Sequence, residues 1–168
     1  MTDRSRLTYT PAMQSIPFSR LDRPTVDVSL LIIRVAVGVV FMYHGAQKMF
    51  GWFDGPGLKF MMGPQGPGGG GILGLLVSIG ECFGGFGIAV GFLSRFSAAA
   101  NIVIMIGAIA MVHGKNGFGM QNNGFEYNWA LIGLLAPILV AGPGAWTIGR
   151  FLPLPRNMST GRPILPLE

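Results

Sequence analysis

The stretch that decides the fold runs from Leu30 to Trp52 and reads LLIIRVAVGVVFMYHGAQKMFGW. It is long and apolar enough to cross a bilayer as a helix, which takes about 20 residues. It nonetheless carries Arg34, His44 and Lys48 on or near one face. Because charged and polar groups are costly in hydrocarbon, these side chains need partners inside the protein. We expect those partners to mark the functional part of the chain.

The composition places the chain among integral membrane proteins. Of its 168 residues 50% are hydrophobic and only 11% are charged, and the mean hydropathy is +0.52. A soluble domain of this size is more polar and more highly charged. The basic residues behind the net charge of +5 are scattered and form no run, so no nucleic-acid partner is expected. The single Cys82 excludes an internal disulfide and a Cys-ligated cluster within one chain.

Four apolar segments predict an all-α membrane protein with the fold of a four-transmembrane-helix bundle. Each segment is close to the roughly 20 residues that a spanning helix needs, although the last is somewhat short. The predicted spans are residues 28–50, 72–93, 96–113 and 127–141. The membrane domain, residues 28–152, ends in a short interfacial helix from Ala145 to Leu152, and it lies between an N-terminal tail (1–27) and a Pro-rich C-terminal tail (153–168).

Basic residues in the connections predict the orientation of the bundle. Lys and Arg are retained on the cytoplasmic side of the membrane. With four spans, both tails and the short turn at Ser94–Arg95 share one side, and that side holds eight of the arginines. The opposite side holds Lys48, Lys59 and Lys115. We therefore expect both termini to be cytoplasmic.

Small residues predict how the first two spans pack. On the first span, steps of three and four residues place small residues on the same stripe as Arg34 and Lys48. On the second span, the same spacing places Glu81 among small residues. Small residues let membrane helices approach closely, which also lets charges meet. The residues expected to pack in this way are Gly38, Gly45, Gly74, Ser78 and Gly85.

The depth of two charges predicts an intramembrane ion pair between Arg34 and Glu81. At about 1.5 Å per residue, Arg34 lies roughly 9 Å and Glu81 roughly 16 Å from the inner boundary of the hydrocarbon core. An unpaired charge at this depth costs several kcal/mol. We expect Arg34 to pair with Glu81, or Glu81 to be protonated. The pair is either a packing clamp or a part of the function.

A second group of polar residues predicts a ligand pocket near the outer end of the bundle. His44 and His113 come from different spans and lie at similar depth, beneath two Gly-rich loops. Lys48, Tyr43 and Glu126 are close to them along the chain. Such residues can hydrogen-bond a quinone or another small polar ligand.

Cofactor chemistry is restricted by the same residues. Two histidines on different helices can ligate a haem, but a haem needs a wide slot of small residues on both helices, and we therefore disfavour it. The sequence contains no metal-ligand cluster, no phosphate-binding loop and no set of nucleophile, base and orienting residue. Independent catalysis by this chain is therefore not expected.

Several motifs resemble the DoxX family of small four-helix bacterial membrane proteins. The first is R-x3-G-x2-F-x2-H-G-x2-K-x-F-G, from Arg34 to Gly51. Others are E-x2-G-G from Glu81 to Gly85, H-G-K-N-G-F from His113 to Phe118, and G-F-E-Y from Gly124 to Tyr127. A final G-P-G motif lies at Gly142 to Gly144. The resemblance covers about residues 28–150 and implies a four-helix fold in the cytoplasmic (inner) membrane.

The resemblance also implies a link to redox chemistry. The family is associated with quinol oxidation, with thiosulfate:quinone oxidoreductase and with assemblies that handle oxidative and thiol stress. Relatives often carry an Asp soon after the final G-P-G, whereas this chain has Trp146 to Arg150 there, W-T-I-G-R. No role that depends on that carboxylate can therefore be transferred.

Three functions remain open on the sequence. The first is a subunit of a quinone-, quinol- or thiol-linked redox assembly in the membrane, not catalytic alone. The second is a purely structural accessory subunit that stabilises a larger membrane complex, and the third is a small-molecule permease. In the first two cases the partners, besides the lipid bilayer, are other subunits that contact the tails and the Gly-lined helix faces.

Overall fold

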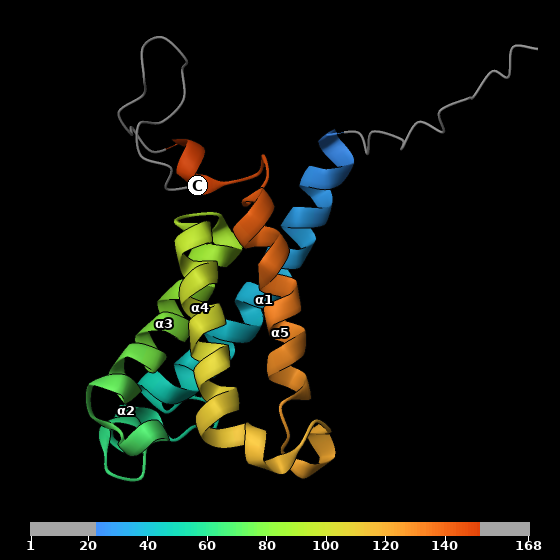
Figure 1. Ribbon diagram of the computed structural model, residues 1–168. Coiled ribbons are helices and arrows are strands. Elements are labelled where there is room, and N and C mark those ends of the chain that lie inside the picture. The colour runs from blue at the N-terminus through green and yellow to red at the C-terminus, as the bar shows by residue number, and fades with distance from the viewer. Residues whose placement is uncertain (1–22, 152–168) are drawn as a thin grey trace, which may run out of the picture.

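Four long helices lie side by side as a bundle in the computed structural model (Figure 1). The structure describes residues 23–151. The long helices are α1 (Arg23–Phe50), α3 (Gly71–Val90), α4 (Ser94–Ala108) and α5 (Glu126–Ala141). Three helical segments are long and apolar enough to cross a membrane, namely Pro24–Phe50, Gly71–Val90 and Ser94–Asn116, and α5 is a shorter apolar helix. The predicted all-α membrane bundle is thus confirmed.

The two ends of the bundle differ, and we name them the tail end and the loop end. At the tail end α1 begins, α3 turns sharply into α4, and α5 finishes (Figure 1). At the loop end lie the longer connections and the short helix α2 (Gly57–Met62). Figure 1 also shows the first turns of α1 extending beyond the α3–α4 turn. Of the predicted tails, residues 1–22 and 152–168 lie outside the described part of the chain.

Helix α1 begins at Arg23 and not at the predicted Val28. Pro24 is compatible with the first helical turn, where backbone N–H groups have no helical acceptor. One turn later, the Ser29 hydroxyl donates to the Thr25 carbonyl at 2.8 Å. With 28 residues, α1 is about 42 Å long, which exceeds the hydrocarbon core of about 30 Å. The start of the apolar run is therefore no guide to where the membrane boundary lies on α1.

Helices α1 and α3 pack antiparallel with their backbones in contact. A Cβ on Gly38 would lie 2.7 Å from the Gly85 carbonyl oxygen and 2.8 Å from the Ala89 Cβ. A Cβ on Gly45 would overlap the backbone of Cys82. Larger residues do not fit at these positions, so the glycines set the register between the two helices.

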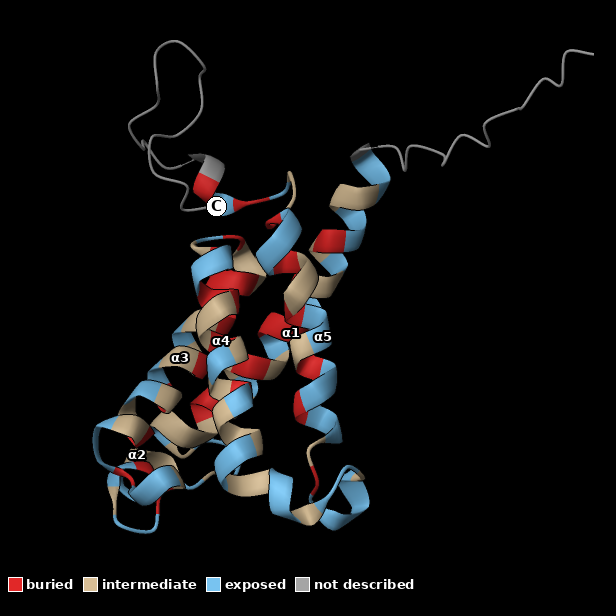
Figure 2. Ribbon diagram, in the orientation of Figure 1, coloured by how far each residue is buried: buried red, intermediate tan, exposed pale blue. Residues whose placement is uncertain are grey.

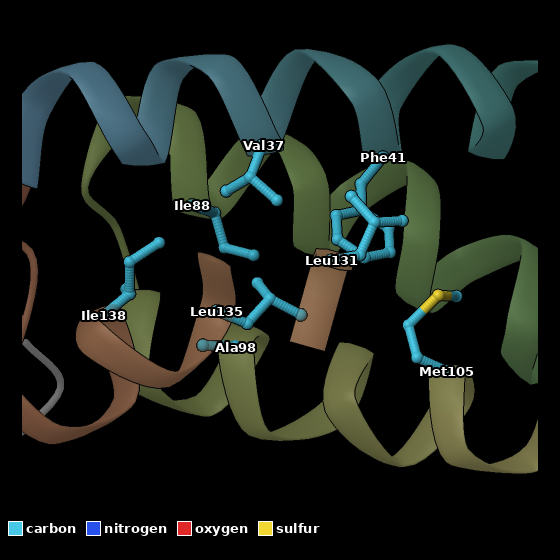
Figure 3. Close-up of a cluster of buried hydrophobic side chains, with 8 residues drawn as sticks. All are labelled: Val37, Phe41, Ile88, Ala98, Met105, Leu131, Leu135 and Ile138. Carbon is cyan, nitrogen blue, oxygen red and sulfur yellow. The ribbon is translucent and has the colours of Figure 1, made fainter. Parts of the chain in front are cut away.

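Buried apolar side chains from all four long helices form the core. Figure 3 shows them pointing toward one another, and they are Val37, Phe41, Ile88, Ala98, Met105, Leu131, Leu135 and Ile138. The outward faces of the helices are largely exposed (Figure 2), and they are apolar as well: Phe96 and Val140 are 73% and 78% exposed. An apolar exterior matches a bundle whose solvent is lipid.

The segment after α5 is not the predicted interfacial helix of residues 145–152. It is an irregular turn that leads into a short 3-10 helix, Ile148–Phe151. Gly142 has a φ of 88°, in the left-handed region that stops a right-handed helix. The carboxylate of Asp27 in α1 accepts a hydrogen bond from the Ala145 N–H at 2.9 Å. This bond ties the segment to the first turns of α1.

Candidate ligand site

Lys48 of α1 and Glu81 of α3 form an ion pair between Nζ and Oε2. The Glu81 side chain is 3% exposed and the Lys48 side chain is 25% exposed. The pair lies beside the close contact of Gly45 with Cys82, where the two backbones bring these side chains together. Glu81 thus pairs with Lys48 and not with the predicted Arg34.

The register of α1 against α3 explains this correction. Along α1, Arg34 precedes Gly45 by about 16 Å, and Gly45 is the residue that packs beside Glu81. One arginine side chain cannot cover that distance. Arg34 instead donates from Nη1 to the carbonyl oxygen of Pro143 at 3.2 Å, at the tail end. The predicted pairing was wrong because the start of the apolar run does not mark the membrane boundary of α1.

His44 is held by hydrogen bonds at both ring nitrogens. Its Nδ1 lies 3.0 Å from Oε1 of Gln47, and Gln47 donates through Nε2 to the Phe53 carbonyl at 3.3 Å. Because the amide of Gln47 turns its oxygen toward the ring, Nδ1 carries the proton and donates it. The other nitrogen, Nε2, then accepts from the Tyr127 hydroxyl at 3.4 Å. These two bonds fix the orientation of the His44 ring.

His113 reaches the same region through an irregularity in its helix. After α4 the chain continues as a π-helical turn, Ile109–His113. Such turns change the direction of the side chains that follow and are frequent at functional sites. Nδ1 of His113 donates to the Asn123 carbonyl at 2.9 Å. This bond fixes the orientation of the His113 ring.

Both histidines and the ion pair line one pocket of about 380 Å³ at the loop end. The pocket lies among α1, α3, α4 and α5, so it joins residues that are far apart in sequence. Its apolar walls include Phe41, Ile104 and Leu131. A small, largely apolar ligand with a few polar atoms suits such a lining. The polar lining residues are His44, Lys48, Glu81, His113, Tyr127 and Asn128.

Two predicted ligand residues lie outside this pocket. Tyr43 stacks on Phe53, with ring centroids 4.6 Å apart, and lines a separate apolar groove between α1 and α3. Its ring also meets that of His44 edge-on at 5.4 Å. The carboxylate of Glu126 accepts a hydrogen bond from the Met120 N–H at 3.0 Å and thereby orders the loop before α5.

The sequence analysis missed two lining residues, Tyr127 and Asn128, in the first turn of α5. Tyr127 bonds to His44, and Asn128 is 6% exposed and donates from Nδ2 to the sulfur of Met105 at 3.4 Å. The sequence does contain an indication of their role, because both residues are polar and stand at the start of an apolar span. They also share the depth of His113 in the bundle.

The predicted packing residues serve two different contacts. Gly38, Gly45 and Gly85 lie between α1 and α3. A Cβ on Gly74 would instead overlap the backbone of α2, so this glycine lets the loop-end helix lie against α3. Ser78 is fully buried, and its hydroxyl donates to the Gly74 carbonyl at 2.7 Å.

The fold and the pocket define a multi-pass helical membrane protein with a ligand-sized, partly polar chamber among its helices. The chain belongs to the DoxX family, whose sequence profile matches residues 29–114, about half of the chain. It is similar to the inner membrane protein YqjF of Escherichia coli (strain K12), with 28% identity over 126 residues, which cover 75% of this chain and 93% of that protein. No solved structure matches. The protein is thus a multi-pass protein of the inner membrane, as the resemblance implied.

Proposed function

We propose that this DoxX-family protein is a quinone-binding membrane subunit of a redox assembly and that it does not catalyse alone. The observation that carries the proposal is the loop-end pocket, where the Lys48–Glu81 pair and the His44–Tyr127 pair lie beside apolar walls. A quinone suits this lining, because its ring is apolar and its carbonyl oxygens accept hydrogen bonds.

The polar pairs of the pocket carry exchangeable protons. Quinone reduction takes up two electrons and two protons, and quinol oxidation releases them. The Lys48 ammonium can give a proton to an oxygen of the reduced quinone, which leaves a neutral amine, and the Glu81 carboxylate can take a proton from a quinol hydroxyl. His44 and Tyr127 form a second pair through which a proton can pass between a hydroxyl and a ring nitrogen. These residues bind the ligand and exchange protons with it.

In this proposal a partner subunit supplies or removes the electrons. The chain has one cysteine, Cys82, so a Cys-ligated cluster cannot be built from this chain alone. Among residues 23–151 no group of three or more His, Cys, Asp and Glu is placed to hold a metal ion. The association of the family with redox assemblies supports the same division of labour. The tail end, with its basic connections, faces the cytoplasm in this arrangement.

The apolar core of the bundle favours a ligand-binding role over transport of a small molecule across the membrane. On α1, Val37 and Phe41 lie between Arg34 and His44, and each is 1% exposed. They belong to the apolar core, which separates the loop end from the tail end (Figure 3). A permease requires a continuous polar path, and this layer interrupts it.

The test is a binding measurement on the purified full chain in nanodiscs, with a short-chain ubiquinone as the probe. We expect saturable binding that His44→Ala weakens about tenfold, equivalent to about 1.4 kcal/mol. The matched control is Val103→Ala, which shortens a side chain that is 68% exposed on α4. This control should bind the probe as the unmodified protein does.

Absent or non-saturable binding would overturn the proposal, as would an equal loss in His44→Ala and Val103→Ala. The structural accessory role makes a different prediction for native membranes. There, stoichiometric partner subunits would co-purify with the chain while solvent extraction released no quinone. Subunit masses and the absorption spectrum of the extract distinguish the two roles.

A further inference from the structure

A second polar site lies at the tail end, where Arg34 and Thr147 are 2% and 5% exposed. Arg34 comes from α1 and Thr147 from the segment after α5. Both lie against Gly91 in the α3–α4 turn: a Cβ there would overlap Nη1 of Arg34 and lie 2.7 Å from the Thr147 Cβ. Gly91 has a φ of 78°, so glycine serves both the turn and this close approach.

Two hydrogen-bonding groups of this site are buried without a partner in the part of the chain that the structure describes. They are Nε of Arg34 and Oγ1 of Thr147. Nη1 of Arg34 donates to the Pro143 carbonyl, and within residues 23–151 the guanidinium has no carboxylate in ion-pair contact. A buried cation with unmet donors is costly, so these groups call for an acceptor beyond those that residues 23–151 supply.

Arg34 and Thr147 line a cavity of about 690 Å³. The cavity lies at the tail end, where α3 turns into α4 and α5 ends. Connections between spanning helices are where we expect lipid headgroups. Helical side chains lean toward the N-terminus of their helix, so the Arg34 guanidinium is directed toward the tail end. The remaining walls are mostly apolar and include Val90, Trp146 and Ile148.

The charges of the cavity specify the kind of ligand. A guanidinium and a hydroxyl together bind the oxygens of a phosphate. Asp27 also lines the cavity, about 10 Å from Arg34 along the α1 axis, and its Oδ1 accepts from the Ala145 N–H. This carboxylate repels a phosphate dianion and attracts an ammonium group. A headgroup that carries both a phosphate diester and an ammonium satisfies both ends.

We propose that the tail-end cavity binds a phospholipid of the phosphatidylethanolamine class. Arg34 and Thr147 donate to the phosphate oxygens, and Asp27 accepts from the headgroup ammonium. The apolar walls contact the first part of the acyl chains. The site is separate from the loop-end pocket and does not depend on the quinone proposal.

The test titrates the delipidated full chain in detergent with three probes, followed by native mass spectrometry. The probes are a short-chain phosphatidylethanolamine, the matching phosphatidylglycerol and inorganic phosphate. We expect the phosphatidylethanolamine to bind most tightly and inorganic phosphate not to displace it. Arg34→Gln should weaken its binding about tenfold, and Asp27→Asn should abolish the preference over phosphatidylglycerol.

Arg95→Gln is the matched control for general attraction between a basic surface and a headgroup. Arg95 also lies at the tail end and donates to the Val140 carbonyl at 3.3 Å, but it is exposed and outside the cavity. Equal weakening by Arg34→Gln and Arg95→Gln would overturn the proposal. Displacement of the lipid by an equal concentration of inorganic phosphate would do the same. Thr147→Val removes the hydroxyl with little change in side-chain volume, and it should also weaken binding of the phosphatidylethanolamine. If Arg34→Gln does not fold, this variant tests the proposal in its place.

Discussion

The two ends of α1 accommodate a positive charge among the helices in opposite ways. At the loop end, Lys48 lies beside the carboxylate of Glu81, whose side chain is 3% exposed. At the tail end, Arg34 is 2% exposed and donates to a backbone carbonyl, that of Pro143. Nε of Arg34 has no partner among residues 23–151. Among the described residues, a carboxylate neutralises the charge of Lys48 but none pairs with Arg34.

This difference indicates which ligand each end can take. A pocket whose charges cancel favours a neutral molecule that forms hydrogen bonds, such as a quinone. A cavity with an uncompensated guanidinium favours an anionic group, such as a phosphate diester. Variants at the two ends should therefore differ in their cost to stability.

Lys48→Ala should be the most destabilising of these substitutions. It leaves the buried Glu81 carboxylate without its counter-charge, and breaking a buried pair on one side costs about 3 kcal/mol. The double variant Lys48→Met with Glu81→Leu should recover most of this loss. The measurement is the free energy of unfolding in detergent micelles. Lys59→Ala, at an exposed lysine of α2, should stay within about 0.5 kcal/mol of the unmodified protein. A double variant less stable than either single one would contradict the pairing.

Gly45→Ala tests the register that brings the ion pair together. Its Cβ would overlap the backbone of Cys82, so the helices must separate at a cost of about 2 kcal/mol. Gly133→Ala is the control, because a Cβ at Gly133 in α5 meets nothing within 4 Å. That variant should be neutral or gain up to about 1 kcal/mol from helix propensity. Equal unfolding free energies for the two variants would refute the close α1–α3 contact.

Arg34→Leu should cost only about 1 kcal/mol, clearly less than Lys48→Ala. The substitution removes a donor from the Pro143 carbonyl, but it leaves no opposite charge buried alone. The same unfolding assay in lipid-free micelles measures it. If Arg34→Leu lowered the free energy of unfolding as much as Lys48→Ala does, the proposed difference between a paired charge at the loop end and an unpaired one at the tail end would be wrong.

Tyr127→Phe should have the smallest effect on stability, at most about 0.5 kcal/mol, because its 3.4 Å bond to His44 is long. The informative readout is the ¹⁵N spectrum of the His44 imidazole, where the Nε2 signal should shift once its donor is lost. Tyr43→Phe keeps the stack on Phe53 and should leave that signal in place. An unchanged Nε2 signal in Tyr127→Phe would mean that Tyr127 does not hydrogen-bond His44.

Parts of the site could be predicted from the sequence because polar residues in apolar spans are conspicuous. The structure brings His44, Lys48 and His113 to one pocket, as their common depth suggested. Tyr43 could not be placed, because its ring contacts that of His44 but faces another groove, between α1 and α3. Glu126 could not be placed either, since its hydrogen bond to the Met120 N–H depends on the path of a loop.

Composition and the spacing of apolar residues were sufficient for the four-helix membrane fold, because a bilayer accepts few spanning structures and requires a minimum length. The partner of each charge was not accessible in this way. It depends on the register of α1 against α3, which is set by backbone contact at Gly38 and Gly45. The register depends on the sequences of both helices together. A shift of a few residues between them changes every pair of facing side chains. Only the packed bundle, therefore, placed Glu81 beside Lys48 and left Arg34 at the tail end.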